Sequence, residues 1–202
     1  RQTPIKQADG TIQPVDRSDE LLRNFRALGL EALISVGGDG SLGIAQRLFE
    51  KGLPVIGVPK TIDNDLAATA ATFGFDTAVQ TATEAIDKIH TTAESHSRIM
   101  VVEVMGRYAG WIALHAGLAG SAHCILIPEI PFSIEAIAEA IRRREQRGRT
   151  YSIIVVAEGA KPKDGALFTS GNKEVGREIR LGGISAWLAT QISSQTGKES
   201  RA

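Results

Sequence analysis

A strand, a glycine-rich turn, a helix and a second strand follow one another within residues 32–58, and this order constrains the fold most. The apolar run 32–36 predicts a short buried strand, and a second run predicts another strand at 54–58. We expect a helix from about Ser41 to Lys51 between them. Two strands joined by one helix run parallel, with a right-handed crossover. The sequence therefore predicts an α/β fold with a parallel sheet.

The same alternation continues in the second half of the chain, whereas residues 1–18 are polar and predict a loop or the tail of an earlier element. This second series predicts a parallel layered unit of its own, so we place a domain boundary near Gly74, between domains 1–74 and 75–202. Ligands usually bind in the cleft between two such domains. The expected helices are 76–93, 109–119, 133–146 and 173–194, and the expected strands are 99–104, 124–127 and 152–157.

Composition excludes several classes of protein. The 23 basic and 23 acidic residues balance and are scattered, so no charged surface indicates a nucleic-acid polymer as a partner. No run approaches the roughly 20 apolar residues of a membrane span, and no signal peptide opens the sequence. The single cysteine, Cys124, lies in an apolar run and forms no disulfide within the chain. These features are typical of a cytoplasmic protein without a membrane partner.

Residues 59–65 concentrate polar chemistry directly after the apolar run 53–58. Two acids at that spacing, Asp63 and Asp65, can serve one as a proton acceptor and the other as a partner for a metal or for phosphate-bound groups. We interpret this stretch as the catalytic centre of a phosphoryl transferase.

The glycine-rich turn at 37–41 supports the same interpretation. Glycines at a strand end let the backbone approach a phosphate, and the start of the following helix offers free N–H groups to it. Asp39 within the turn can hold Mg²⁺ through water. The alternative is a plain tight turn in which Ser41 caps the helix.

Taken together, these stretches resemble 6-phosphofructokinase. The match covers essentially the whole chain in family order, although the glycine-rich turn alone also resembles NAD kinases and diacylglycerol kinases. The resemblance implies two Rossmann-like parallel-sheet layered domains with an interdomain cleft. The motifs that carry it are Gly37-Gly38-Asp39-Gly40-Ser41, Pro59-Lys60-Thr61-Ile62-Asp63-Asn64-Asp65, Met105-Gly106-Arg107-Tyr108-Ala109-Gly110, Pro128-Glu129-Ile130, Ala157-Glu158-Gly159 and Glu199-Ser200-Arg201-Ala202.

The resemblance implies that ATP-Mg²⁺ phosphorylates fructose 6-phosphate. Asp63 would take the proton from the sugar 1-hydroxyl, Asp65 would lie near the metal, and Thr61 would contact the phosphoryl group in flight. Arg107 completes the implied catalytic set and also lines the sugar-phosphate site. In that site Glu158 would accept a hydrogen bond from a sugar hydroxyl.

Further implied contacts extend both substrate sites. Met105 and Gly106 would lie beside Arg107 in the sugar-phosphate site, from the same subunit. Arg98 and Arg201 match arginines that reach the sugar phosphate of a neighbouring subunit, so the resemblance also implies a homo-oligomer, a tetramer or a dimer.

The cofactor side leaves the phosphoryl donor open. Asp39 would bind Mg²⁺, and Gly38, Gly40 and Ser41 would lie along the nucleotide phosphates. In this family a glycine at the position of Gly40 leaves room for ATP, whereas Lys60 is typical of members that use pyrophosphate. The resemblance therefore implies an ATP-dependent member of the pyrophosphate-related branch. Pyrophosphate as donor is the alternative, followed by a non-catalytic sensor of the sugar phosphate or nucleotide.

Departures from the family pattern concern the ends and the regulation. The chain starts without Met, and family segments that finish the nucleotide and sugar sites would lie before Arg1 and after Ala202. We therefore expect an internal fragment that lacks turnover by itself. His90 and His123 stand where members with a nucleotide-diphosphate effector carry an arginine and a metal-binding glutamate, which removes a cation and an oxygen ligand. Either these histidines bind no ligand or a different anionic effector acts there.

Overall fold

The structure is a computed structural model that describes residues 3–6, 12–163, 165, 167–169 and 181–202. The described residues form two compact units. The small unit comprises residues up to Thr61 together with Leu66–Phe73, and the large unit comprises Ile62–Asp65 and the residues from Gly74 onward. The predicted ranges of the domains, 1–74 and 75–202, stay a prediction.

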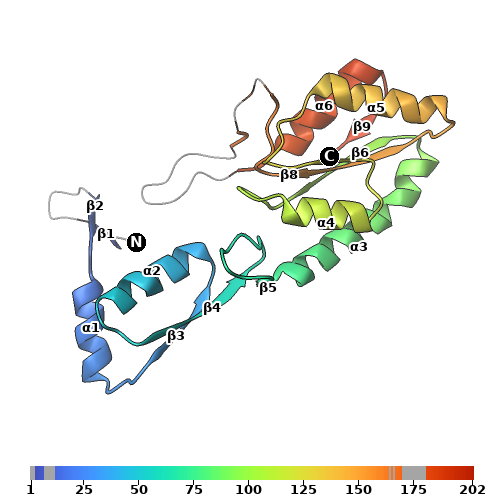
Figure 1. Ribbon diagram of the computed structural model, residues 1–202. Helices are drawn as coiled ribbons and strands as arrows, with labels where there is room; N and C mark the ends of the chain where they lie inside the picture. Colours follow the sequence, from blue (N-terminus) through green and yellow to red (C-terminus); the bar gives the residue numbers. More distant parts are fainter. Residues whose placement is uncertain (1–2, 7–11, 164, 166, 170–180) are drawn as a thin grey trace. The chain divides into compact units, whose positions relative to one another are not determined.

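The small unit contains the predicted strand–helix–strand arrangement. Strands β3 and β4 pair in parallel, with Leu33 opposite Val55 and Gly37 opposite Pro59, and β5 extends their sheet in the order β3-β4-β5. The prediction of a parallel sheet with a helical crossover is therefore confirmed for this part of the chain (Figure 1). The elements are β1 (Thr3–Lys6), β2 (Ile12–Val15), α1 (Ser18–Ala27), β3 (Leu33–Gly37), α2 (Asp39–Glu50), β4 (Val55–Thr61) and β5 (Phe73–Gly74).

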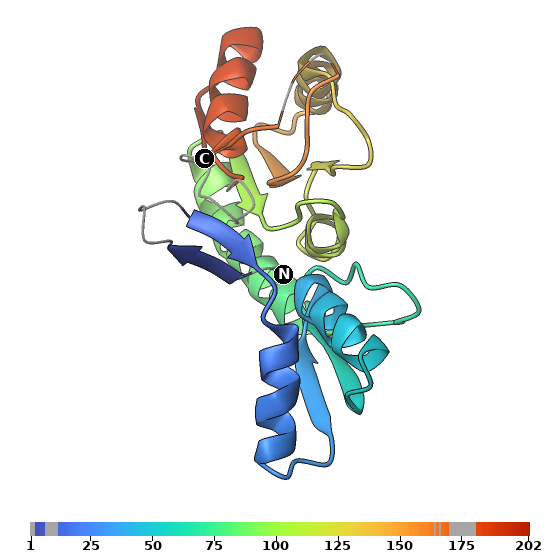
Figure 2. The same cartoon turned by 90° about the vertical axis from the view of Figure 1, so that its left-hand side faces the viewer.

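The prediction of a loop, or of the tail of an earlier element, for residues 1–18 missed two strands. Strands β1 and β2 pair as an antiparallel ribbon in which Pro4 lies opposite Pro14, and Figure 2 draws them as two blue arrows of opposite direction. A ribbon of two strands has open edges on both sides, where a proline removes no hydrogen bond from the ladder. The prolines that indicated a loop are therefore compatible with strands here.

The sheet of the small unit is covered by other residues on one face and exposed on the other. Only Ala45, Leu48 and Leu53 are buried apolar residues among its described side chains. Ile34 and Ile56 are paired across β3 and β4 and stay 64% and 61% exposed, and Val36 is also exposed. Parallel sheets usually bury both faces, so this unit has little core.

The large unit contains a four-stranded parallel sheet in the order β7-β8-β6-β9. Figure 1 shows α5 and α6 on one side of this sheet and α3 and α4 on the other. The elements are α3 (Phe75–Ser95), β6 (Ile99–Val104), α4 (Trp111–Ala119), β7 (Cys124–Leu126), α5 (Ile134–Gln146), β8 (Ser152–Ala157), α6 (Ile184–Thr196) and β9 (Ser200–Arg201).

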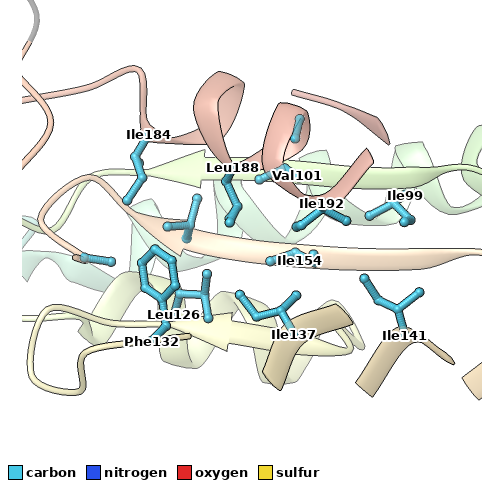
Figure 3. Close-up of a cluster of buried hydrophobic side chains, with 13 residues drawn as sticks. Ile99, Val101, Leu126, Phe132, Ile137, Ile141, Ile154, Ile184, Leu188 and Ile192 are labelled. Carbon is cyan, nitrogen blue, oxygen red and sulfur yellow. The ribbon is translucent and has the colours of Figure 1, made fainter. Parts of the chain in front are cut away.

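Both faces of this sheet are packed, and alternate residues of β8 contribute to each. Ile154 and Val156 join a cluster with side chains of α5 and α6, part of which Figure 3 shows. Ile153 and Val155 join a second cluster with side chains of α3 and α4. Successive side chains of a strand point to opposite faces, so a strand covered on both faces reads as one apolar run.

Several boundaries differ from the prediction. Helix α6 begins at Ile184, because Gly182 and Gly183 adopt positive φ values of 133° and 86° that interrupt a helix; residues 173–180 of the predicted helix lie outside the described residues. Strand β4 continues through Thr61, so the first residues of the stretch 59–65 belong to a strand. The two-residue strands β5 and β9 were not predicted. No helix in the described part of the chain is both long enough and apolar enough to cross a membrane.

Candidate active site

The glycine-rich turn and the end of β4 meet at the carboxyl end of the small sheet. A Cβ atom at Gly38 would lie 3.1 Å from Cβ of Thr61, and one at Gly37 would lie 2.5 Å from Cβ of Ser41. Side chains at these two positions would therefore force Thr61 or Ser41 to move. The hydroxyl groups of Ser41 and Thr61 lie beside the glycine backbone because that backbone carries no side chains.

Helix α2 begins earlier than predicted, at Asp39. Its N-cap is Gly38, with an extended backbone, and no side chain caps the helix; the carbonyl of Gly38 accepts from Ser41 N and Leu42 N at 3.0 Å. The alternative in which Ser41 caps the helix is therefore wrong. Asp39 and Gly40 lie exposed in the first turn, where the helix dipole and free N–H groups favour an anion.

The segment after β4 carries the two predicted acids. Asn64 separates them and adopts a left-handed backbone with φ of 54°, a conformation that asparagine tolerates better than most residues. Asp63 is half-buried, whereas Asp65 and Lys60 are exposed. The two carboxylates therefore differ in their access to solvent.

The ends of β6 and β8 are fastened to each other at the carboxyl edge of the large sheet. Glu158 N donates to the carbonyl of Val104 at 2.9 Å, and Gly159 N donates to the carbonyl of Gly106 at 3.0 Å. A Cβ atom at Gly159 would lie only 2.0 Å from the carbonyl oxygen of Arg107, so this position accepts glycine alone. The contact places the backbone of Arg107 directly beside that of Glu158 and Gly159.

The surroundings of Glu158 show which predicted residues come together. Burial raises the pKa of the Glu158 carboxyl, Arg107 lowers it, and the negative charges of Glu103 and Asp63 raise it. Arg107 and Asp63 therefore both lie within electrostatic reach of the Glu158 carboxylate in the large unit. This grouping joins residues that are up to 95 positions apart in the sequence (158 minus 63).

Arg98 and Arg201 lie at the other edge of the same sheet, where strands β6 and β9 begin. Both donate to the carboxylate of Glu199, Arg98 through Nε at 2.8 Å and Arg201 through Nε at 2.9 Å. These bonds lower the pKa of Glu199. The structure thus brings the two arginines together, but not to the edge that carries Arg107 and Glu158.

Comparison with known proteins identifies the family. A family model described as phosphofructokinase matches residues 1–202. This chain belongs to the phosphofructokinase family. The resemblance expected from the sequence motifs is confirmed.

Curated relatives of the phosphofructokinase family carry two kinds of name. The ATP-dependent 6-phosphofructokinase of Chloroflexus aurantiacus is 55% identical over 201 residues, which cover 100% of this chain and 53% of that relative. The pyrophosphate–fructose 6-phosphate 1-phosphotransferase of Amycolatopsis methanolica is 60% identical over 176 residues, which cover 86% of this chain and 51% of that relative. The chain spans about half the length of the curated relatives it matches.

Solved phosphofructokinases share the fold. The pyrophosphate-dependent phosphofructokinase from Marinobacter aquaeolei superposes with a TM-score of 0.73 at 29% identity, covering 96% of this chain and 49% of that one. Phosphofructokinase of Pichia pastoris in the T-state gives 0.75 at 32% identity, covering 96% and 23%. The predicted α/β fold with Rossmann-like parallel sheets is confirmed.

Within this phosphofructokinase chain, the two histidines of the expected effector region are engaged by the protein itself. The ring of His90 bridges the hydroxyl of Tyr151 at 3.3 Å and the carbonyl of Gly120 at 2.8 Å. His123 accepts from Ile153 N at 2.8 Å, and its pKa is lowered to about 4, first by burial and then by the charges of Arg144 and His90. His123 is therefore neutral near pH 7, and both rings form hydrogen bonds within the large unit.

Two carboxylates at helix starts were given no role by the sequence interpretation, although Glu129 belongs to one of the quoted motifs. Glu103 accepts from the first turn of α6, and Glu129 accepts from Gly110 N, at the start of α4, at 2.9 Å. The one sequence signal for such a role was the place of Glu103, an acid inside the apolar run of β6. Their partners lie 80 and 19 residues away, too far along the chain for a local pattern to reveal.

Proposed function

We propose that the protein transfers the terminal phosphoryl group of ATP to the 1-hydroxyl of fructose 6-phosphate, which gives fructose 1,6-bisphosphate and ADP, the phosphofructokinase step of glycolysis. The observation that carries the proposal is the position of Glu158, beside the backbone of Arg107 and within electrostatic reach of Asp63. A base, a phosphate-binding arginine and an acceptor for a sugar hydroxyl are the groups that an acceptor site for phosphoryl transfer needs. Family membership supports the same reaction.

Asp63 is the proposed base. As the bond between the sugar O1 and the terminal phosphorus forms, the bond to the leaving phosphate oxygen of ADP breaks, and Asp63 takes the hydroxyl proton. Thr61, which ends β4 two residues before Asp63, would contact the transferred group. Asp65 is exposed and would lie toward the metal and the charged donor. Such positioned proton transfer contributes typically 10²–10⁴-fold to a rate.

The proposed donor residues lie at the start of α2. Gly38, Gly40 and Ser41 would follow the nucleotide phosphates, and Asp39 would hold Mg²⁺, whose charge would neutralise charge developing on the phosphates. The exposed carboxylate of Asp39 at a helix start fits a hard cation that keeps several waters and binds through one or two carboxylates. Among the described residues no cluster of three or more acidic, histidine or cysteine side chains could hold a metal.

Room beside Gly40 favours ATP as the donor. A Cβ atom at Gly40 would meet nothing within 4 Å, so packing against the described residues does not require glycine there. Packing therefore does not explain why residue 40 has no side chain, whereas a bound ATP, which is larger than pyrophosphate, would need the space that a side chain would fill. Pyrophosphate remains the second candidate, because Lys60 is exposed beside the site and a relative named for pyrophosphate is 60% identical.

The sugar-phosphate residues would come from two subunits. Met105, Gly106, Arg107 and Glu158 would bind the sugar from one subunit of a cytoplasmic homo-oligomer, a tetramer or a dimer. Arg98 and Arg201 would reach the phosphate bound to the neighbouring subunit. Their shared hydrogen bonds to Glu199 support this proposal, because guanidinium groups that already hold a carboxylate also suit a phosphate. We propose no nucleic-acid polymer and no membrane as a partner.

A donor exchange on the full-length protein tests this function. Initial rates with fructose 6-phosphate are measured with ATP-Mg²⁺ and, separately, with pyrophosphate-Mg²⁺ at matched concentrations. The proposal expects ATP to give the higher kcat/KM. A preference for pyrophosphate would select the second candidate, and binding of fructose 6-phosphate without turnover by either donor would indicate a non-catalytic sensor.

A further inference from the structure

Glu103 is an acid inside the apolar strand β6, and it holds the start of α6. Gly183 N donates to its Oε1 at 3.1 Å, while Ser185 donates to its Oε2 through N at 3.0 Å and through Oγ at 2.8 Å. These are three hydrogen bonds from the first turn of a helix that begins 81 residues later (184 minus 103). A carboxylate at a helix N-terminus is stabilised by both the N–H groups and the dipole.

The alternation of β6 and β8 puts Glu103 on the same face of the sheet as Glu158. Ile99 and Val101 of β6 pack in the cluster beneath α5 and α6, and Glu103 is the next residue on that face. Ile154 and Val156 of β8 pack in the same cluster, and Glu158 follows them. Glu103 lies opposite Val156 in the register, so the two acids lie at the same corner of the sheet.

The loop before α6 depends on this carboxylate. Gly182 and Gly183 adopt positive φ values, and Gly183 is the N-cap without a side chain of its own to cap the helix. Glu103 supplies the missing cap from another element. An amide in place of this carboxylate has one acceptor oxygen where the carboxylate has two, so either Gly183 N or Ser185 N would lose its acceptor.

We propose that Glu103 is a positioning residue for Glu158: it holds the N-terminus of α6 against the end of β6 and presents a second negative charge to the Glu158 carboxylate. The second part rests on the proposed function, in which ionised Glu158 accepts a hydrogen bond from the sugar. The first part concerns the fold alone.

The charge effect has a definite sign. Burial and the charges of Glu103 and Asp63 raise the pKa of Glu158, and Arg107 lowers it. Neutralising Glu103 therefore lowers the pKa of Glu158. Ionised Glu158 then persists to lower pH, and the acid limb of kcat/KM for fructose 6-phosphate moves to lower pH.

Glu103→Gln in the full-length protein tests both parts, with Glu129→Gln as the matched control because Glu129 caps the start of α4 through Gly110 N. Hydrogen exchange followed by mass spectrometry reports on the peptide that begins α6. We expect its protection to fall roughly tenfold in Glu103→Gln, the scale of losing hydrogen bonds to a charged group. Glu129→Gln should speed exchange at the start of α4 only. Unchanged protection at α6 in Glu103→Gln would overturn the proposal.

The acid limb of the pH profile supplies the second readout. It should move to lower pH in Glu103→Gln and stay in place in Glu129→Gln; a limb that moves in both or in neither overturns the charge effect. Ser185→Ala provides a milder variant if Glu103→Gln does not fold, because it removes one hydrogen bond and keeps the charge. It should weaken protection at α6 and leave the limb unmoved. If fructose 6-phosphate is not a substrate, the proposed function fails, yet the exchange result still decides what Glu103 does at α6.

Discussion

The two units of this chain support their proposed site residues in different ways. In the large unit, Arg107 and Glu158 follow strands that are buried on both faces by two apolar clusters. In the small unit, Asp39 and Gly40 begin a helix that covers one face of a sheet whose other face stays exposed at Ile34. Dense side-chain packing thus holds the residues proposed to bind the sugar. The residues proposed to bind the phosphoryl donor are positioned by the backbone geometry at glycines. Substitutions in the two units should therefore differ in whether they affect stability or donor choice.

The largest effect should come from Asp63, in the segment through which the chain passes from one unit to the other. In the full-length protein, Asp63→Asn removes the proposed base but keeps the shape of the side chain. We expect kcat to fall by roughly two to four orders of magnitude, with little change in the Kd for fructose 6-phosphate. Steady-state kinetics and calorimetry measure the two quantities. Asp87→Asn, on an exposed part of α3, is the control, and an unchanged kcat in Asp63→Asn would remove this residue as the base.

A matched pair of isoleucines tests the difference in packing. Ile154 in β8 is fully buried, whereas Ile34 in β3 is 64% exposed. Replacing a buried isoleucine by alanine costs about 2–5 kcal/mol, and an exposed position costs about 0.5 kcal/mol. Denaturant unfolding of this chain should therefore show a large loss of unfolding free energy for Ile154→Ala and a small one for Ile34→Ala. Equal losses would mean that the exposed face of the small unit is covered in solution, and the contrast between the units would fail.

Substitutions at the proposed phosphoryl-donor residues should change the KM for the donor and leave the unfolding free energy nearly unchanged. Gly40→Asp adds a negative charge where the proposal places nucleotide phosphates, and we expect the KM for ATP to rise by about tenfold or more. Gly43 supplies a control within α2, because a Cβ atom there also meets nothing within 4 Å. Gly43→Asp should leave the KM for ATP near its original value. Equal rises in both variants would indicate a general effect of charge on the helix.

The smallest effect concerns His123 in the large unit. Its pKa is about 4 in the fold and close to the ordinary 6.5 when unfolded, so the unfolded chain binds a proton first as pH falls. The contribution of neutral His123 to the free energy of unfolding is complete above pH 6.5 and is lost as pH falls from 6.5 toward 4. Because the ring is only half-buried, solvent screening reduces the loss to on the order of 1 kcal/mol.

His123→Asn should remove this pH dependence, since the amide oxygen can accept from Ile153 N in place of the ring nitrogen. The measurement is the unfolding free energy of both proteins at pH 7 and pH 5. The wild type should lose more stability than the variant over that interval. A parallel loss in the two proteins would contradict the lowered pKa of His123.

Local sequence patterns predicted the elements that bury apolar residues. The runs at β6 and β8 and the parallel arrangement of β3 and β4 are set by hydrophobic periodicity, which acts over a few residues. The start of α6 was misplaced because it depends on Gly183 and on a distant acceptor, Glu103. Strand β9 was missed because two residues carry no periodicity.

The candidate site residues came partly from local patterns and partly from the family resemblance. Asp63, Arg107 and Glu158 stood out as polar residues after apolar runs, and their roles came from the family resemblance. The approach of Arg107 and Asp63 to Glu158 depends on contacts between segments far apart in the chain, which no local pattern contains. Arg98 and Arg201 were predicted to share a role at the sugar phosphate of a neighbouring subunit. Glu199 belonged to a quoted motif, but its hydrogen bonds to both arginines were not predicted, because Arg98 lies 101 residues away in the sequence.

The close approach at Gly159 limits how this family member can diversify. A side chain at position 159 would strike the carbonyl oxygen of Arg107, so the spacing between the two loops is fixed by the main chain. Directed evolution of the proposed sugar site should therefore leave residue 159 constant. Met105, which is exposed, and Glu158 offer positions where side chains can change while the frame that carries them keeps its dimensions.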